Sequence, residues 1–345
     1  MPGAATATGT GIAAGLVVFW SSGFIGAELG TREAPADTLL MWRFIAATAL
    51  LGGAWLLYRA IGARRSRLTR AARRTPLTRR ALAEQAAIGT LSQGGYLGAT
   101  VWSVGLGVPT GTAALIAALQ PLAAGALAGR LLGETVTRRQ WAGLVIGLAG
   151  VAMVVRDDMS TASTTPTWAY ALPFAGMAAL LGASFLERRA KAPLPAVDAL
   201  PIHCLTSAAL FSAVALAGGR GAPPEGGAFW AAVAWVVLLS TVGGYGFYWL
   251  SLSRRGVTRT SALMYLTPPT TAVWAYAMFG DRPGPLAVAG MAVSLAGVIA
   301  ASVGGRRQRA GAGTIPSEPT RSVPNPAYLT SEKGTAKEPQ SQTVR

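Results

Sequence analysis

The fold is decided by a stretch that occurs twice, GETVTRRQWAG at residues 133–143 and GDRPGPLAVAG at residues 280–290. The two copies lie 147 residues apart. Further matches flank them in the same order: Leu148-Ala149-Gly150-Val151 with Leu295-Ala296-Gly297-Val298, Gln120-Pro121 with Thr267-Pro268, and, at a spacing of 149, Gly95-Tyr96 with Gly244-Tyr245. Single matches between segments rich in Gly and Ala arise by chance. Colinear matches with one two-residue gap indicate an internal repeat.

The composition predicts a membrane protein. Of the 345 residues, 51% are hydrophobic and 13% are charged, whereas about a quarter of the residues in soluble domains are charged. The apolar residues come in runs of about twenty, the length that crosses a bilayer core as a helix. We therefore expect an all-α integral membrane protein with ten transmembrane helices, at residues 11–29, 38–58, 83–105, 110–129, 139–156, 168–187, 198–217, 229–251, 258–279 and 284–304.

The basic residues predict the orientation of these helices, because short loops rich in Lys and Arg stay in the cytoplasm. Nine arginines lie in the loop 59–80, which places that loop and both termini on the cytoplasmic side of the plasma membrane. The predicted outer loops hold only Arg32, Arg156, Arg220 and Arg282, although the chain carries 30 Lys and Arg residues. We attribute the net charge of +16 to topology and to attraction by anionic lipid headgroups. It does not indicate nucleic acid as a partner, because the Arg-rich loop lacks aromatic residues after Tyr58.

Each repeat contains five helices, an odd number, so the second copy enters the membrane from the opposite side. The predicted parts are a short cytoplasmic N-terminus at 1–10, a first five-helix repeat at 11–156, a second at 168–304 and a disordered cytoplasmic tail at 305–345. The turn at Gly133-Glu134 is then inside, and its counterpart at Gly280-Asp281 is outside. Inverted repeats are typical of secondary transporters, in which the substrate site lies between the copies near the midplane.

The sequence resembles the EamA-type transporters of the drug/metabolite transporter superfamily. The residues that carry the resemblance are Trp20-Ser21-Ser22-Gly23-Phe24, Arg43-Phe44, Gln120-Pro121, Gly133-Glu134, the stripe Trp141, Gly143, Gly147 and Gly150, and, in the second copy, Pro268, Gly280-Asp281, Gly290 and Gly297. The resemblance covers about residues 11–304. It implies a ten-helix exporter or facilitator of small metabolites or drugs, with both termini in the cytoplasm and a central cavity between the halves. The Arg-rich loop and the tail look like additions to this plan.

A solute cavity requires polar and aromatic residues on one face of several helices, because polar groups that face lipid are costly. In the third predicted helix, steps of four and three place Tyr96, Thr100 and Ser103 on one face. The predicted substrate-binding residues are Trp20, Phe24, Gln93, Tyr96, Thr100, Gln120, Tyr245, Trp249, Thr267, Thr271 and Trp274. The alternative is that such polar groups only bond neighbouring helices, at about 0.6 kcal/mol per bond. Local kinks are expected at Pro121, Pro268 and Pro269, which lack the backbone donor.

Three ionisable residues inside the predicted helices are candidates for a charge or coupling role: Glu28, Arg43 and His203. Arg43 has three options: it extends to the headgroups, pairs with Glu28 or binds substrate. Glu28 alone would be a solvated group at a helix end. His203 either serves proton coupling or is a lone histidine at the interface. No carboxylate falls clearly at the midplane, so these residues do not support proton or sodium coupling.

Together these patterns predict a secondary transporter that exports a small organic metabolite or drug by alternating access. The alternatives are a membrane-embedded enzyme acting on a lipid or lipid-linked substrate, and a non-transporting scaffold. An enzyme needs a nucleophile–base pair or a metal cluster, and a chain with one His and one Cys, Cys204, offers neither. We therefore expect no catalytic residue, metal or cofactor. Small-residue stripes at Gly143-x-x-x-Gly147 and Gly290-x-x-x-Ser294 predict close helix packing within the monomer, and they leave a homodimer open.

Overall fold

The computed structural model describes residues 2–68, 77–132, 138–161 and 164–311, and every regular element in these ranges is a helix. Residues 1–305 form one compact unit and residues 306–345 a second; the description below concerns the first. Each of the ten predicted ranges overlaps one or more of these helices, and the ranges 110–129 and 258–279 are interrupted within. The predicted turn at Glu134 and most of the predicted tail lie outside the described residues.

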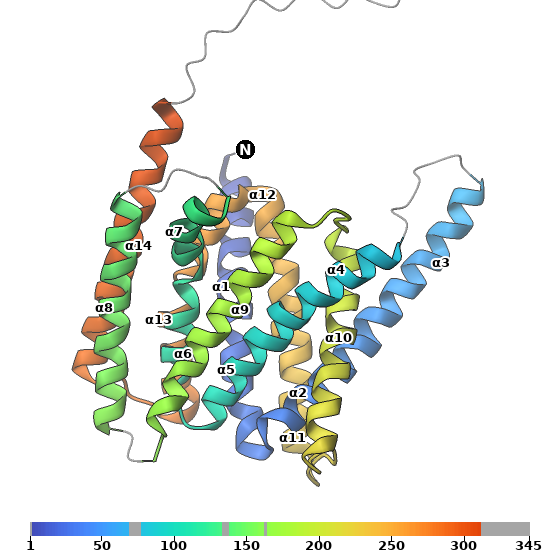
Figure 1. The fold of residues 1–345 in the computed structure, drawn as a ribbon, viewed down its shortest axis with the longest axis horizontal. Helices are drawn as coiled ribbons and strands as arrows, with labels where there is room; N and C mark the ends of the chain where they lie inside the picture. Colours follow the sequence, from blue (N-terminus) through green and yellow to red (C-terminus); the bar gives the residue numbers. More distant parts are fainter. Residues whose placement is uncertain (1, 69–76, 133–137, 162–163, 312–345) are drawn as a thin grey trace, which may run out of the picture. The chain divides into compact units, whose positions relative to one another are not determined.

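The first half of the chain forms five helical rods (Figure 1). In chain order its elements are α1 (Pro2–Glu33), α2 (Ala36–Ala47) continuing through η1 (Thr48–Gly52) into α3 (Gly53–Leu68), α4 (Arg79–Gly89) continuing through η2 (Thr90–Gly95) into α5 (Tyr96–Gly105), α6 (Thr110–Ala118) followed by α7 (Gln120–Leu132), and α8 (Arg138–Thr161). The first rod begins before residue 11 and the second runs on into the Arg-rich segment, because Ala, Arg and Leu favour helix.

The second half follows the same plan. Its elements are η3 (Thr167–Tyr170) leading into α9 (Ala171–Arg189), α10 (Ala196–Ala217), α11 (Gly227–Trp235) continuing through η4 (Val236–Gly244) into α12 (Tyr245–Met264), α13 (Thr267–Phe279) and α14 (Pro285–Gly311). Within α12, Gly256 adopts φ 76° and ψ 169°, a conformation that favours glycine. This kink divides the eighth predicted range from the ninth.

Five helical stretches are long and apolar enough to cross a membrane, judged by length and composition over the described residues. They are Gly9–Glu33, Ala36–Ile61, Thr167–Arg189, Ala196–Ala217 and Gly227–Gly256. Two shorter apolar helices, Thr110–Ala124 and Pro285–Ala300, are also present. The chain is therefore an all-helical protein with several membrane-spanning segments.

The two halves pack by exchanging equivalent contacts. The first helix of the first half, α1, packs against η4 and α12, which belong to the third rod of the second half. Reciprocally, α9 packs against η2 and α5, in the third rod of the first half. The second rods of the two halves also meet, where α2 contacts α10, and the fourth rods meet where α6 contacts α13. Such reciprocal pairing is what a two-fold relation between the halves requires.

Two equivalent helices, α8 and α14, approach each other closely along a seam, and they lie side by side in Figure 1. A Cβ atom added at Gly150 would collide with the carbonyl oxygen of Gly290, and one added at Gly297 would lie 2.8 Å from that of Gly143. Between these points, the Ser294 hydroxyl donates a hydrogen bond of 2.9 Å to the Gly147 carbonyl. Residues later in α8 therefore contact residues earlier in α14, so the two helices run antiparallel. The small residues of both stripes are used inside the monomer, as predicted.

Two rods are interrupted at equivalent prolines. α6 ends at Ala118 and α7 begins at Gln120, one residue before Pro121. In the second half, α12 ends at Met264 and α13 begins with Thr267-Pro268-Pro269, where the prolines occupy the first helical turn. Proline fits that turn because the backbone donors there have no partner within the helix. The kinks expected at these prolines are therefore confirmed as breaks in the helices.

Candidate functional site

Of the spaces that the described residues form between the helices, two cavities and a small pocket concern the site. The first, called here the aromatic cavity, has a volume of about 330 Å³. The second, the charged vestibule, has about 430 Å³. The third, the Arg43 pocket, has about 50 Å³. The aromatic cavity and the Arg43 pocket share four lining residues: Trp20, Phe24, Tyr96 and Tyr245.

Most of the predicted substrate-binding residues line the aromatic cavity. They are Trp20 and Phe24 of α1, Tyr96 of α5, Gln120 of α7, Tyr245 and Trp249 of α12, and Thr267 of α13. The ring of Trp20 lies 5.8 Å from that of Tyr245 and 5.6 Å from that of Tyr248, centre to centre. Aromatic faces thus form one wall of a cavity that also holds hydroxyl and amide groups.

Two tyrosines that line the aromatic cavity, Tyr96 and Tyr245, occupy equivalent positions in the two repeats. Tyr96 begins α5 directly after the wide π-helical turn η2, and Tyr245 begins α12 directly after the wide turn η4. A wide turn inserts an extra residue into the helix and redirects the side chains that follow, and such turns are frequent at functional sites. The glycines of the turns allow close approach: a Cβ at Gly95 would lie 2.7 Å from the Cβ of Ala179 on α9.

His203 also faces the aromatic cavity. It lies on α10, where its Nε2 atom is 2.8 Å from Oε1 of the buried Gln85. The side chain is half-buried, so its ring belongs to the cavity wall.

Four predicted residues occupy other places. Thr100 lines the Arg43 pocket and donates a hydrogen bond of 2.8 Å to the Tyr96 carbonyl. Gln93 is buried beside Cys204, with 3.9 Å between Oε1 and Sγ. Thr271 is fully buried, and Trp274 packs its ring 5.7 Å from that of Trp235. Gln93, Thr271 and Trp274 line neither of the two cavities nor the pocket.

Sequence reasoning missed the contribution of α9. Leu180, Ser184 and Glu187 line the aromatic cavity, and the Gln120 amide donates to the Ser184 hydroxyl at 3.4 Å. Steps of four and three residues place these three side chains on one helical face. That spacing could have indicated a cavity-lining face on this helix, although a single Ser and a Glu at the helix end are a weak signal.

Arg43 is buried, with 3% of its surface exposed. It lines the pocket named after it, together with Tyr96, Thr100 and Tyr245. Its guanidinium lies 5.5 Å from the ring centre of Phe44. Of the three options for Arg43, pairing with Glu28 is not the arrangement observed, because Glu28 binds Arg32 at 2.6 Å. Extension to the headgroups does not fit a side chain that points into the bundle.

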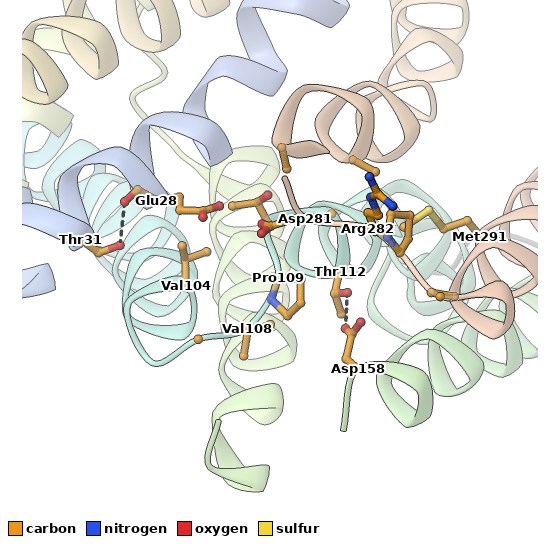
Figure 2. Close-up of a pocket in the computed structure, with 18 of the residues that line it drawn as sticks. Glu28, Thr31, Val104, Val108, Pro109, Thr112, Asp158, Asp281, Arg282 and Met291 are labelled. Atoms are coloured by element: carbon orange, nitrogen blue, oxygen red, sulfur yellow. Dashed lines mark hydrogen bonds between the residues drawn. The ribbon is translucent and has the colours of Figure 1, made fainter. Parts of the chain in front are cut away.

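The charged vestibule lies where α1, α6, α8 and the segment before α14 converge (Figure 2). Glu28 and Asp281 point toward each other in this view. Asp158 accepts a hydrogen bond of 2.5 Å from the Thr112 hydroxyl. Asp158 follows the predicted membrane span, and burial raises the pKa of its carboxyl to about 6, although the Thr112 hydroxyl lowers it. The vestibule can therefore change its charge over the mildly acidic range.

A thin layer of side chains separates the vestibule from the aromatic cavity. On α1, Phe24 lines the cavity and Glu28 the vestibule, four residues or about 6 Å apart along the helix. On α6, Ala114 lines the aromatic cavity and Thr112 lines the vestibule. The layer contains Ala27, Ala113 and Thr271, which are at most 1% exposed. About one helical turn of packed side chains thus closes the path between the two spaces.

The described residues contain no group of three or more His, Cys, Asp or Glu side chains arranged to hold a metal ion. The aromatic cavity combines ring faces with hydroxyl and amide groups, which suits an organic solute held by hydrogen bonds and ring contacts. The vestibule is lined instead by charged, hydroxyl-bearing and small apolar residues.

The EamA-like transporter family matches residues 7–156 and, a second time, residues 167–303. The chain belongs to the EamA-like transporter family. The two matches coincide with the two helical halves described above, and they confirm the resemblance predicted from the sequence. A member of this family with several apolar helices long enough to cross a bilayer is a multi-pass membrane protein.

The EamA chain is also similar to a curated protein and to a solved structure. It is 29% identical over 197 residues to a protein of Streptantibioticus cattleyicolor named "Probable terminal-alkyne amino-acid exporter". The match covers 56% of this chain and 64% of the relative. A solved structure described as "Crystal structure of protein" is similar over 88% of this chain and 99% of its own, with a TM-score of 0.57 and 22% identity. This likeness concerns the fold.

Proposed function

We propose that this EamA-family chain is a secondary transporter that exports a small organic solute across the plasma membrane by alternating access. The observation that carries the proposal is the pair of spaces on either side of a barrier one helical turn thick. A small relative movement of the halves is enough to open such a barrier on one side and close it on the other. Ten membrane-crossing helices in two inverted repeats are part of the proposal.

The seam between α8 and α14 supports the inverted relation of the repeats. Antiparallel equivalent helices with reciprocal contacts are expected where one half is threaded oppositely to the other. Equivalent halves provide two equivalent gates, so each half can form the closed side in turn. Membership of a transporter family favours this mechanism over the membrane-enzyme and scaffold alternatives.

The charges support loading from the cytoplasm. The mouth of the aromatic cavity is lined by Glu187, Leu194 and Ala196, next to the basic cluster Arg188, Arg189 and Lys191. The positive-inside rule places that cluster on the cytoplasmic face. The vestibule lies at the predicted outer loops, beside Arg32 and Arg282. A solute that enters the aromatic cavity from the cytoplasm leaves through the vestibule.

The test is solute flux in liposomes that contain the purified full chain. Because the relative is named as an exporter of a terminal-alkyne amino acid, L-propargylglycine, a small amino acid of that kind, is the first probe. A panel of other amino acids, amines and uncharged metabolites follows. Counterflow above that of empty liposomes is the expected result. Its absence for the whole panel would refute the proposed function.

A further inference from the structure

Arg43 carries a buried charge for which the described part of the chain supplies no carboxylate partner. Its Nε atom is buried and has no hydrogen-bond partner among the described residues. The described residues that line its pocket are apolar, aromatic or hydroxyl-bearing, and none is acidic. An uncompensated buried charge costs several kcal/mol. This arrangement favours an anion that arrives from outside the chain.

Three carboxylates on α1, α2 and α10 have partners other than Arg43. Glu28 of α1 binds Arg32 at 2.6 Å. Asp37 of α2 binds Arg220 at 2.6 Å, and Asp198 of α10 accepts a hydrogen bond of 2.7 Å from the Trp55 indole. The hydroxyl-bearing residues that share the pocket with Arg43 are Tyr96, Thr100, Ser240 and Tyr245, none of which is an acid of carboxylate strength.

We infer that the Arg43 pocket is the docking site for the carboxylate of an organic solute, and that the rest of the solute occupies the adjoining aromatic cavity. The inference deepens the proposed function and rests on it. A guanidinium presents paired donors that match a carboxylate in a bidentate contact. The pocket volume of about 50 Å³ exceeds the roughly 10–15 Å³ that a single water molecule requires, so the pocket has room for a carboxylate group.

The shapes of the Arg43 pocket and the aromatic cavity indicate what the remainder of the ligand is. The shared walls at Trp20, Phe24, Tyr96 and Tyr245 join the pocket to a cavity of about 330 Å³, so the carboxylate sits at the closed end and the side chain extends toward the mouth. An ammonium group next to the carboxylate would lie against these rings, where cation–π attraction is worth about 0.5–2 kcal/mol. A small α-amino acid meets both requirements. A phosphate ester carries more charge than the single arginine that lines this pocket can match.

The assignment is tested by binding to the full chain in lipid nanodiscs. The probes are L-norvaline and L-phenylalanine, each compared with its carboxamide, which has nearly the same shape and no negative charge. Wild type should bind each acid at least about tenfold more tightly than its amide. Arg43→Gln should weaken acid binding by about tenfold or more and leave amide binding within a factor of about three. Arg43→Lys, which keeps the charge and loses the paired donors, should fall between.

The matched control is Arg80→Gln, which removes the same charge from an exposed residue of α4 that lines none of these spaces. It should bind acid and amide like wild type. Equal affinity of wild type for acid and amide would overturn the assignment without any variant. So would an equal loss of both ligands in Arg43→Gln, or an Arg43-dependent thermal shift produced by chloride alone while the amino acids produce none. Amine flux in Arg43→Gln liposomes separates this failure from failure of the proposed function, which predicts that the path persists.

Discussion

The seam between α8 and α14 makes a quantitative prediction about Gly150. A Cβ atom at this position would meet three atoms of α14: the Gly290 carbonyl oxygen, the Ser294 nitrogen and the Ser294 hydroxyl. Two of the three belong to the backbone, so the helices themselves must separate. Forcing one extra carbon into packed structure costs about 1–3 kcal/mol, and backbone partners place Gly150→Ala at the upper end of that range.

Two further glycines calibrate the expectation. A Cβ at Gly147 would meet chiefly the Leu119 Cδ2 methyl, at 2.8 Å, and a leucine side chain can rotate away. A Cβ at Gly53 of α3 would meet nothing within 4 Å, so Gly53→Ala should stabilise by up to about 1 kcal/mol through helix propensity. The predicted order of destabilisation is Gly150→Ala, then Gly147→Ala, with Gly53→Ala neutral or stabilising.

The assay is thermal unfolding of the purified variants in one detergent, followed by a fluorescent probe of Cys204 or by light scattering. For domains of 150–250 residues, 1 kcal/mol shifts the midpoint by about 2–4 °C. We expect Gly150→Ala to unfold at least about 4 °C below wild type. A midpoint equal to that of Gly53→Ala would refute the close antiparallel packing of these two helices.

Three other outcomes are expected. Burial raises the pKa of Asp158 to about 6 from an ordinary value of 3.8, so the folded state binds a proton there more tightly than the unfolded state, and stability falls as pH rises from about 4 to about 6. Asp158→Asn should remove that fall in melting curves across this range. The control Glu225→Gln, at an exposed residue, should retain it. Ala118→Trp, which places an indole in the aromatic cavity, should reduce flux by about tenfold or more while Ala142→Trp, on an exposed face of α8, transports normally; equal flux would remove the cavity from the path. Ser184→Ala removes the hydrogen-bond partner of the Gln120 amide and should weaken solute binding by several-fold in the nanodisc assay, since a hydrogen bond contributes about 1 kcal/mol; unchanged binding would show that α9 only lines the space.

Much of the fold follows from local sequence signals. Apolar runs bounded by Arg-rich loops located the helical rods, and the paired prolines at Pro121 and Pro268 marked the two breaks. The spacing of Gly143, Gly147 and Gly150 against Gly290, Ser294 and Gly297 anticipated the tight seam. These features are written in residues close together in the chain, or in one motif repeated, so periodicity alone reveals them.

The site was harder to predict because it depends on tertiary placement. Nothing in the residues around Gln93 distinguishes it from Tyr96, yet Gln93 lies within the wide turn η2 and is buried beside Cys204, whereas Tyr96 directly follows the turn. Trp274 has the helical spacing of a cavity residue, but its ring packs at a tilt against that of Trp235. The sequence left three roles open for Arg43. Choosing among them required the positions of Glu28, Arg32 and Tyr245 in the fold.

The central claim is that the aromatic cavity and the charged vestibule open to opposite sides of the membrane. It is tested most directly by attaching a membrane-impermeant maleimide to single cysteines in a Cys204→Ala background. Ala196→Cys places the thiol at the mouth of the cavity, and Thr31→Cys places it in the vestibule. In intact cells the account predicts labelling at position 31 and none at position 196, with the pattern reversed in inverted vesicles. Labelling of both positions from the same side would contradict it.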